Sequence, residues 1–172
     1  CFPKDLDAFM NISQKLGYDF ELLKSVKYIN EDQKKVFLEK IKDSLWIIKD
    51  KTIAVLGLSF KPETDDIRSA PSLDIIAALK KDGAKLRVFD PIVAGKAKDI
   101  LGERVKFCKD PYDACRDSDC LLIVTEWPEF KELDFKRIKK LMNRPLVIDG
   151  RNIYDPAAMK KSGFIYLGMG RK

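Results

Sequence analysis

The sequence predicts an α/β protein with a doubly wound, Rossmann-like parallel sheet, preceded by a helical segment that contains a long helix. From residue 51 onward, short apolar runs that end in glycine, aspartate or threonine alternate with amphipathic stretches. The runs are apolar on both faces, which is typical of strands buried in a parallel sheet. Residues 19–49 instead carry apolar side chains at three- and four-residue steps, which indicates a helix.

The helical segment is expected to start with a short helix over residues 5–16, with Asp5 as its N-cap and Gly17 as its stop. Residues 19–49 are helical again. Asn30-Glu31 is a candidate break, and we expect one short helix followed by a long one. A long amphipathic helix ahead of a domain serves as core, as a strut between domains or as a subunit interface, and the pattern leaves these alternatives open.

The sheet region begins with the clearest signal, an apolar strand over 52–57 that ends in glycine. Gly83 and Pro91 stop the helix and the strand that precede them. The expected elements after the first strand are a helix at 71–81, a strand at 86–90, a helix at 94–101, a strand at 105–107, a helix at 111–116, a strand at 120–125, a helix at 129–142, a strand at 146–149, a helix at 155–162 and a strand at 164–167.

Composition narrows the classes of function. The 172 residues suit one domain with a helical extension. The net charge is +6, and lysine and glutamate are mixed along the chain, which favours a solvated mixed surface over nucleic-acid binding. A modest positive excess also suits an anionic small ligand such as a nucleotide diphosphate.

The cysteine and histidine content argues against a zinc site and against a histidine general base. The chain has four cysteines and no histidine, so the common zinc-ligand sets and the usual general base are missing, and no metal site is expected. Cys108, Cys115 and Cys120 form no C-x-x-C pair and are expected to be buried free thiols, which fits a reducing cytoplasm. No signal peptide or membrane span is expected. Because the chain starts at Cys1, we expect it to begin inside a longer protein.

Ligands of such sheets bind at the carboxyl ends of the strands. The segment after the first strand, Gly57 to Ser72, is long and has one glycine where a dinucleotide site has three, so it does not support tight approach of a pyrophosphate. Lys61 and Arg68 are candidates to contact a phosphate or a sugar hydroxyl. The alternative pairs them locally with Glu63, Asp65 and Asp66.

Polar residues follow three further strands. Asp90 could bind ribose hydroxyls or shape the turn with Pro91. Thr125-Glu126-Trp127 could simply begin a helix, with Pro128 in its first turn. Gly150 allows a sharp turn that presents Arg151 at the same edge, unless Arg151 is an ordinary surface arginine.

Cys1 stands just ahead of a helix, with Lys4 and Asp5 close by in the sequence. A helix N-terminus and a lysine would stabilise its thiolate, and Asp5 could hold or deprotonate a water. Taken alone, these residues favour a buried thiol with Asp5 as a helix cap.

Five segments together resemble the UDP-glucose 6-dehydrogenase family, within the UDP-glucose/GDP-mannose dehydrogenase group. They are Cys1-Phe2-Pro3-Lys4-Asp5, Gly57-Leu58-Ser59-Phe60-Lys61-Pro62-Glu63-Thr64-Asp65-Asp66-Ile67-Arg68-Ser69-Ala70-Pro71-Ser72, Phe89-Asp90-Pro91, Thr125-Glu126-Trp127 and Ile148-Asp149-Gly150-Arg151-Asn152. They occur in the family's order, and the resemblance covers the whole chain.

The resemblance implies oxidation of UDP-glucose to UDP-glucuronate with reduction of two NAD+, through a cysteine thiohemiacetal and a thioester that water hydrolyses. It implies that Cys1 is the nucleophile, that Asp5 assists the hydrolytic water, and that Lys4 lies near NAD. Arg68 would reach towards NAD. Phe60, Lys61 and Arg151 would contact the nucleotide sugar, Arg151 in its own or a neighbouring subunit.

By the same resemblance, residues 1–50 form a central helical segment that dimerises through the long helix, and residues 51–172 form the C-terminal UDP-sugar-binding domain. NAD would be bound mainly by an N-terminal domain that precedes this chain, so we expect the fragment alone to be inactive. The product would feed polysaccharide biosynthesis in the cytoplasm.

Three alternatives remain. The substrate could be UDP-N-acetylmannosamine or GDP-mannose, and Thr125-Glu126-Trp127 together with residues 1–5 favours glucose. The chain could also be a non-catalytic nucleotide-binding module, or a helical dimerisation protein.

Overall fold

The structure, a computed structural model, describes residues 2–171 and divides into two compact units. One extends to Lys40 and the other starts at Ile41. Cys1 lies outside the described residues. The predicted roles of residues 1–50 in dimerisation and of residues 51–172 in UDP-sugar binding stay predictions.

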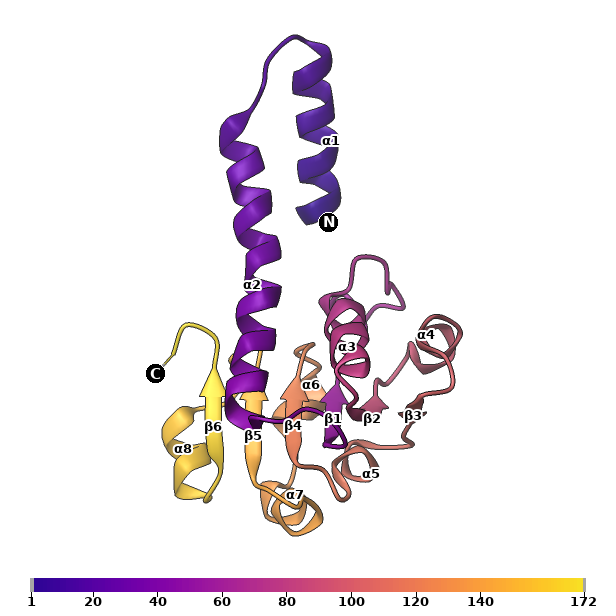
Figure 1. The fold of residues 1–172 in the computed structure, drawn as a ribbon, viewed down its shortest axis with the longest axis vertical. Helices are drawn as coiled ribbons and strands as arrows, with labels where there is room; N and C mark the ends of the chain where they lie inside the picture. Colours follow the sequence, from indigo (N-terminus) through magenta and orange to yellow (C-terminus); the bar gives the residue numbers. More distant parts are fainter. Residues whose placement is uncertain (1, 172) are drawn as a thin grey trace. The chain divides into compact units, whose positions relative to one another are not determined.

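The first unit is a pair of antiparallel helices, α1 (Phe2–Lys15) and most of α2 (Glu21–Leu45) (Figure 1). An ion pair of 2.6 Å joins Lys27 to Asp7, and the rings of Phe9 and Phe20 lie 5.8 Å apart. Two details of the prediction are wrong. Helix α2 continues through Asn30 and Glu31, and Asp5 lies inside the first turn of α1 because that helix already begins at Phe2.

This helical unit leaves a large apolar surface in contact with solvent. Phe9, Ile12, Leu16, Tyr18, Leu22, Tyr28, Ile29 and Val36 are all exposed by more than a third. The salt bridges of the unit lie between these apolar positions and add little, because exposed ion pairs are screened.

The second unit contains a six-stranded, all-parallel sheet in the order β3-β2-β1-β4-β5-β6, which confirms the predicted doubly wound fold (Figure 1). Its elements are β1 (Thr52–Leu56), α3 (Pro71–Lys81), β2 (Lys85–Phe89), α4 (Ala94–Leu101), β3 (Val105–Phe107), α5 (Pro111–Cys115), β4 (Cys120–Ile123), α6 (Pro128–Lys131), α7 (Phe135–Leu141), β5 (Leu146–Asp149), α8 (Pro156–Lys161) and β6 (Ile165–Gly168).

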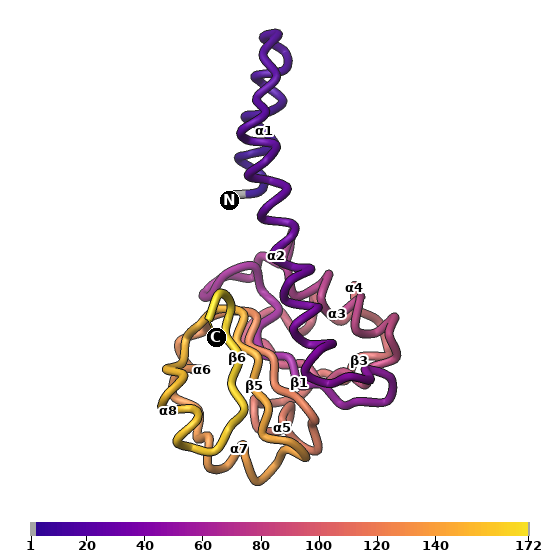
Figure 2. The backbone as a smooth tube through the Cα atoms, turned by 60° about the vertical axis from the view of Figure 1, so that its left-hand side comes forward, coloured from indigo at the N-terminus to yellow at the C-terminus, as the bar shows by residue number. Residues whose placement is uncertain are grey.

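Helices cover the sheet on both faces. Helices α3 and α4 lie on one face, and α5, α7 and α8 lie on the other (Figure 2). The apolar core under α5 to α8 takes Leu56 from β1, Ile123 from β4 and Val147 from β5, together with Phe130 and Ile138. Every position of strands β1, β4 and β5 is buried except Thr52, which is partly buried, and this agrees with their nearly continuous apolar sequences.

The predicted helix over residues 129–142 is wrong in one respect, because the structure divides it into α6 and α7. Asp134 interrupts the helix and becomes the N-cap of α7, where its carboxylate accepts a hydrogen bond of 3.1 Å from the backbone N–H of Arg137. The side chain of an aspartate competes with the hydrogen bonds of the helix backbone. Aspartate therefore stabilises a helix more as its N-cap than in its interior.

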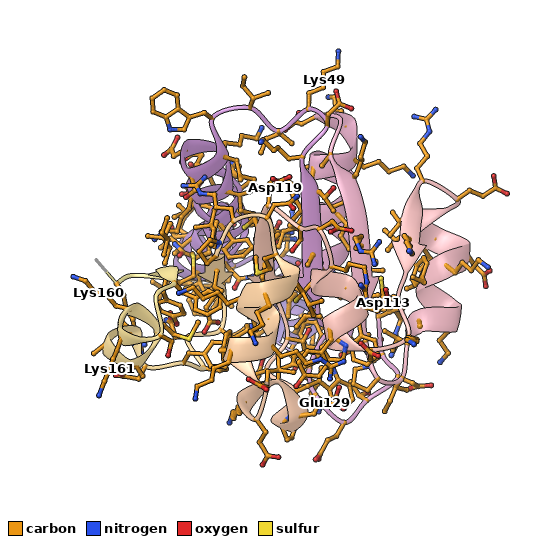
Figure 3. The ribbon with its side chains drawn as sticks, turned by 90° about the horizontal axis from the view of Figure 1, so that it is seen from below. Lys49, Asp113, Asp119, Glu129, Lys160 and Lys161 are labelled. Atoms are coloured by element: carbon orange, nitrogen blue, oxygen red, sulfur yellow. The ribbon has the colours of Figure 1, made fainter. Side chains whose placement is uncertain are left out.

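Figure 3 looks at the edge of the sheet where the strands begin, and Lys49 and Asp119 lie there. The Asp119 carboxylate accepts a hydrogen bond of 2.9 Å from the Thr52 N–H, which ties the starts of β4 and β1 together.

Trp46 lies between α2 and β1 and is 91% exposed, with its backbone in the left-handed region at a φ of 61°. No helix within residues 2–171 has the length and apolar character needed to span a bilayer.

The three described cysteines are buried free thiols, as predicted. Burial raises the pKa of Cys108 to about 11 and that of Cys115 to about 12. Burial also raises the pKa of Cys120. A raised pKa lowers the thiolate fraction at neutral pH, so these thiols are poor nucleophiles and poor metal ligands.

Candidate functional site

The candidate site lies at the carboxyl edge of the sheet, beside the point where the strand order reverses between β1 and β4. Loops that leave adjacent strands in opposite directions open a crevice at such a point. The loop after β1 spans residues 57–70, and the segment after β4 spans 124–127. Hydrogen bonds of 2.9 Å from Gly57 N–H to Phe89 O and from Val124 N–H to Leu56 O bring the ends of β1, β2 and β4 together.

Asp90, at the end of β2, fixes two loops at once. Its side chain is 2% exposed, and one carboxylate oxygen accepts hydrogen bonds from the N–H groups of Leu58 at 2.7 Å and Ser59 at 3.0 Å. The other oxygen accepts from Ile92 and Val93, both at 3.0 Å. Burial favours the neutral acid, but the four backbone donors outweigh burial and hold the pKa of Asp90 below its ordinary value.

The turn-shaping alternative for Asp90 therefore describes the structure, and binding of ribose hydroxyls by this side chain does not. Both carboxylate oxygens are already occupied by donors, and the group has almost no surface left for a ligand.

Thr125 and Trp127 join the segment after β4 to the loop after β1. The Thr125 hydroxyl donates to the Ser59 carbonyl at 2.7 Å, and the Trp127 indole N–H lies 3.1 Å from both Ser59 Oγ and Asp90 Oδ2. Gly57 has φ of +91°, and a Cβ there would lie 2.5 Å from Thr125 Cβ. Glycine at residue 57 therefore lets the two segments pack closely, because any side chain there would collide with Thr125.

The outer part of the loop after β1 is fixed by local ion pairs. Arg68 donates to both oxygens of Asp66, from Nε at 2.9 Å and from Nη2 at 2.9 Å, and its side chain remains 81% exposed. The side-chain hydrogen bonds from Arg68 lower the pKa of Asp66. Lys96 of α4 pairs with Asp65, and that hydrogen bond lowers the pKa of Asp65. The local pairing of Arg68 predicted as one alternative is present.

Phe60 and Lys61 lie at the start of the same loop, next to the segment that Asp90 holds. Phe60 donates its backbone N–H to the Asp66 carbonyl at 2.9 Å, so the loop folds back on itself, and its ring is partly exposed. Lys61 is exposed, and its ammonium makes no hydrogen bond or ion pair with any residue that the structure describes. Both side chains are therefore available to a ligand at this edge.

A second buried carboxylate, Asp149 at the end of β5, shapes the turn that carries Arg151. It accepts hydrogen bonds from the backbone N–H groups of Arg151 at 2.9 Å and Ile153 at 2.8 Å, and from the Tyr166 hydroxyl at 2.9 Å. Asn152 has φ of 55°, and its side chain exchanges two hydrogen bonds of 2.9 Å with the backbone of Met169. The backbone of this turn is thus fixed on both sides of Arg151.

Arg151 forms a bidentate ion pair with Glu126. Its Nε donates to Glu126 Oε2, and its Nη2 donates to Oε1 at 2.9 Å. About a third of each side chain is exposed, at 36% for Arg151 and 33% for Glu126. Burial opposes the charge on Glu126, but the hydrogen bond from Arg151 prevails and lowers the pKa of Glu126.

An open pocket of about 590 Å³ surrounds this pair. Its lining residues are Glu126, Lys131, Gly150, Arg151, Asn152 and Ile153. Two cations and one carboxylate converge there, so the pocket suits a polar ligand with anionic character.

Two further residues predicted for the site, Lys4 and Asp5, are exposed on α1, in the first of the two compact units. The candidate nucleophile Cys1 falls outside the described residues. The structure brings Phe60, Lys61 and Arg151 to one edge of one sheet, whereas the roles of Cys1, Lys4 and Asp5 stay predictions.

Comparison with known proteins identifies this arrangement. The sequence profile described as "UDP-glucose/GDP-mannose dehydrogenase family, UDP binding domain" matches residues 54–156, which include both loops and the pocket. The chain belongs to this family. It is 44% identical over 171 residues to "UDP-glucose 6-dehydrogenase TuaD" of Bacillus subtilis (strain 168), and 40% identical over 179 residues to "UDP-glucose 6-dehydrogenase" of Pseudomonas aeruginosa.

These alignments cover 99% of the chain but 37% and 39% of the two relatives, so the chain spans well under half of their length. Among solved structures, a UDP-glucose dehydrogenase from Pyrobaculum islandicum matches with a TM-score of 0.84 and 30% identity, over 98% of this chain and 36% of that one. A UDP-D-ManNAc dehydrogenase from Pyrococcus horikoshii matches with a TM-score of 0.73 and 29% identity, over 92% and 36%.

Within this UDP-binding domain, the first turn of the sheet does not fit NAD. A dinucleotide site needs glycines that let a pyrophosphate approach the backbone, and here the one glycine packs against Thr125. The described part of the domain therefore offers no dinucleotide cradle at β1.

Sequence reasoning overlooked several residues of this UDP-binding domain. It placed Glu126 and Ser72 in motifs without giving either side chain a role, and it did not consider Lys131. The buried Ser72 hydroxyl donates to the Leu58 carbonyl at 2.6 Å, and Glu126 and Lys131 line the pocket. The turn-shaping role of Asp90 was predicted as one alternative, and the same signal was present for Asp149, because each stands at the end of a strand and precedes a turn.

Proposed function

We propose that this chain is the C-terminal part of an NAD-dependent UDP-glucose 6-dehydrogenase that oxidises UDP-glucose to UDP-glucuronate through a cysteine thiohemiacetal and thioester. The observation that carries the proposal is identity of 44% and 40%, along 99% of the chain, to proteins named UDP-glucose 6-dehydrogenase. The pocket at Arg151 supports it, because its charges suit a nucleotide sugar. Residues 51–172 then form the UDP-sugar-binding domain.

In this proposal Phe60, Lys61 and Arg151 bind the substrate. Lys61 is an exposed cation on a loop fixed by Asp90, and Arg151 is presented by a turn fixed by Asp149. A diphosphate is the part of UDP-glucose that most needs such cations. Lys61→Ala should weaken binding of UDP about tenfold, the usual loss for one charge-assisted hydrogen bond.

The proposed chemistry belongs to Cys1 and Asp5, with Lys4 and Arg68 on the cofactor side. The thiolate of Cys1 adds to the C6 carbonyl carbon at the aldehyde level, so the aldehyde stays bound, and Asp5 assists the water that later cleaves the thioester. When bound, NAD+ is the oxidant, and its main binding site would belong to a further domain of the full-length protein. Residues 1–50 would dimerise through α2, whose exposed apolar side chains suit a second copy of the chain.

The decisive experiment has two parts. The 172-residue chain should bind UDP in calorimetry and should not reduce NAD+ in the presence of UDP-glucose. The full-length protein that contains this sequence should oxidise UDP-glucose, and Cys1→Ser should abolish turnover while UDP binding is retained. Full turnover with serine would contradict the covalent mechanism, and failure of the chain to bind UDP would contradict the domain assignment.

UDP-N-acetylmannosamine is a second candidate substrate, favoured by the fold match to the UDP-D-ManNAc dehydrogenase at 29% identity. Turnover of the full-length protein with each nucleotide sugar separates the two candidates. The higher identity to proteins named UDP-glucose 6-dehydrogenase supports glucose.

A further inference from the structure

We propose that Glu126 is a positioning residue that holds the Arg151 guanidinium by one edge and leaves its other edge free for the nucleotide diphosphate. The inference rests on the proposed function and adds to it, since Glu126 would act through Arg151 without touching the ligand. Both residues line the pocket and leave neighbouring strands, Glu126 after β4 and Arg151 after β5.

Different residues fix the backbone and the side chain of Arg151. Its backbone is fixed by Asp149, which accepts its N–H at 2.9 Å, and by the hydrogen bonds between Asn152 and Met169. These contacts fix the Cα and leave the long side chain free to rotate. Among the described residues, only Glu126 makes a hydrogen bond or ion pair with the guanidinium, so Glu126 alone sets its direction.

The ion pair between Glu126 and Arg151 uses one edge of the guanidinium. Glu126 binds the edge formed by Nε and Nη2, which occupies two of the five N–H bonds of a guanidinium. The two N–H bonds of Nη1 and the second of Nη2 remain. These are enough to donate to two oxygens of a phosphate, so a ligand need not displace Glu126.

The pocket keeps a net positive charge with the ion pair in place. Lys131 lines the same pocket, so the two cations outnumber the single carboxylate of Glu126. An anion therefore still meets an excess of positive charge when the Glu126–Arg151 pair is intact. The pair orders Arg151 before the ligand arrives, which reduces the entropy lost on binding.

The positioning role predicts how substitutions combine. Glu126→Gln should weaken UDP binding about fivefold to tenfold when Arg151 is present, and less than twofold in an Arg151→Gln background. Arg151→Lys keeps the charge but cannot present two edges, so it should bind UDP more weakly than the wild type and more tightly than Arg151→Gln. Glu132→Gln removes one negative charge at the C-cap of α6, outside the residues that line the pocket, and should leave UDP binding unchanged.

The experiment is calorimetry with UDP at fixed salt on these variants, together with the Arg151 side-chain Nε–H resonance of the ligand-free chain. The wild type should give a protected Nε–H signal that Glu126→Gln loses. Tighter UDP binding by Glu126→Gln, an equal loss in both Arg151 backgrounds, or a protected signal that survives Glu126→Gln would each overturn the inference and leave the proposed function standing. Absence of UDP binding by the wild type would overturn both.

Discussion

The Trp127 indole donates to the Asp90 carboxylate at 3.1 Å, and so links the segment after β4 to a group that already holds the loop after β1. Asp90 thus accepts from five N–H groups within a buried space. Asp90 is thus a main anchor of the loop that carries Phe60 and Lys61, beside the Thr125 hydroxyl that donates to the Ser59 carbonyl.

Replacing Asp90 with asparagine should be costly, because the amide would turn N–H donors towards backbone N–H donors. We expect Asp90→Asn to lower the free energy of unfolding by about 2–4 kcal/mol. Urea denaturation followed by circular dichroism measures the loss. Ser59→Ala removes only one acceptor of the Trp127 indole and should cost about 1 kcal/mol, so equal losses in the two variants would contradict the central role of Asp90.

Asp90 should also make stability depend on pH in a defined direction. Its folded pKa lies below its unfolded value, so the stabilisation is complete above the ordinary carboxyl pKa of about 3.9 and is lost as the pH falls through the folded pKa. The difference in unfolding free energy between wild type and Asp90→Asn should therefore shrink as the pH falls below about 4. A difference that grows as the pH falls would contradict a lowered pKa of Asp90 in the folded protein.

Two glycines should respond to alanine in opposite ways. At Gly57 a Cβ would lie 2.5 Å from Thr125 Cβ at a φ of +91°, so Gly57→Ala should destabilise the protein by about 3 kcal/mol or more. At Gly95, in α4, a Cβ would meet nothing within 4 Å, and alanine should stabilise by up to about 1 kcal/mol. Thermal unfolding of both variants tests the pair, and tolerance of Gly57→Ala would show that the two loops can separate.

Thiol reactivity should single out Cys1. The raised pKa of Cys108 and Cys115, about 11 and 12, leaves almost no thiolate at pH 8, and Cys120 is buried as well. One thiol per folded chain should react rapidly with Ellman's reagent, and four after denaturation. The rapid phase should vanish in Cys1→Ser, and a rapid phase that remains there would mean that a core cysteine opens to solvent.

Much of the fold could be predicted because short-range signals agree with the tertiary structure. Helices α3 and α4 and strands β3 and β5 have the predicted bounds. In α3, α4 and β5 an apolar pattern is combined with a proline, glycine or aspartate at one end. The break between α6 and α7 was not predicted, because its only signal in the sequence is Asp134, the residue that caps α7. The start of α1 was missed because Asp5 resembles an N-cap in sequence.

The candidate site was harder to predict than the fold. The motifs located Arg151 and Lys61, but the partners that fix them come from other strands. Glu126 meets Arg151 only because β4 and β5 are neighbours, and Asp90 meets Trp127 only because β2 and β4 flank β1. The sequence does not give the order of the strands in the sheet, so these pairs cannot be identified from it.

The two tryptophans of the chain occupy opposite environments: Trp127 is buried against Asp90, and Trp46 stands almost wholly in solvent. Their emission should therefore separate by wavelength and by access to acrylamide. A Trp46→Phe protein would carry one fluorophore, set where two loops meet. It would give an optical signal for motion at the mouth of the domain without any added label.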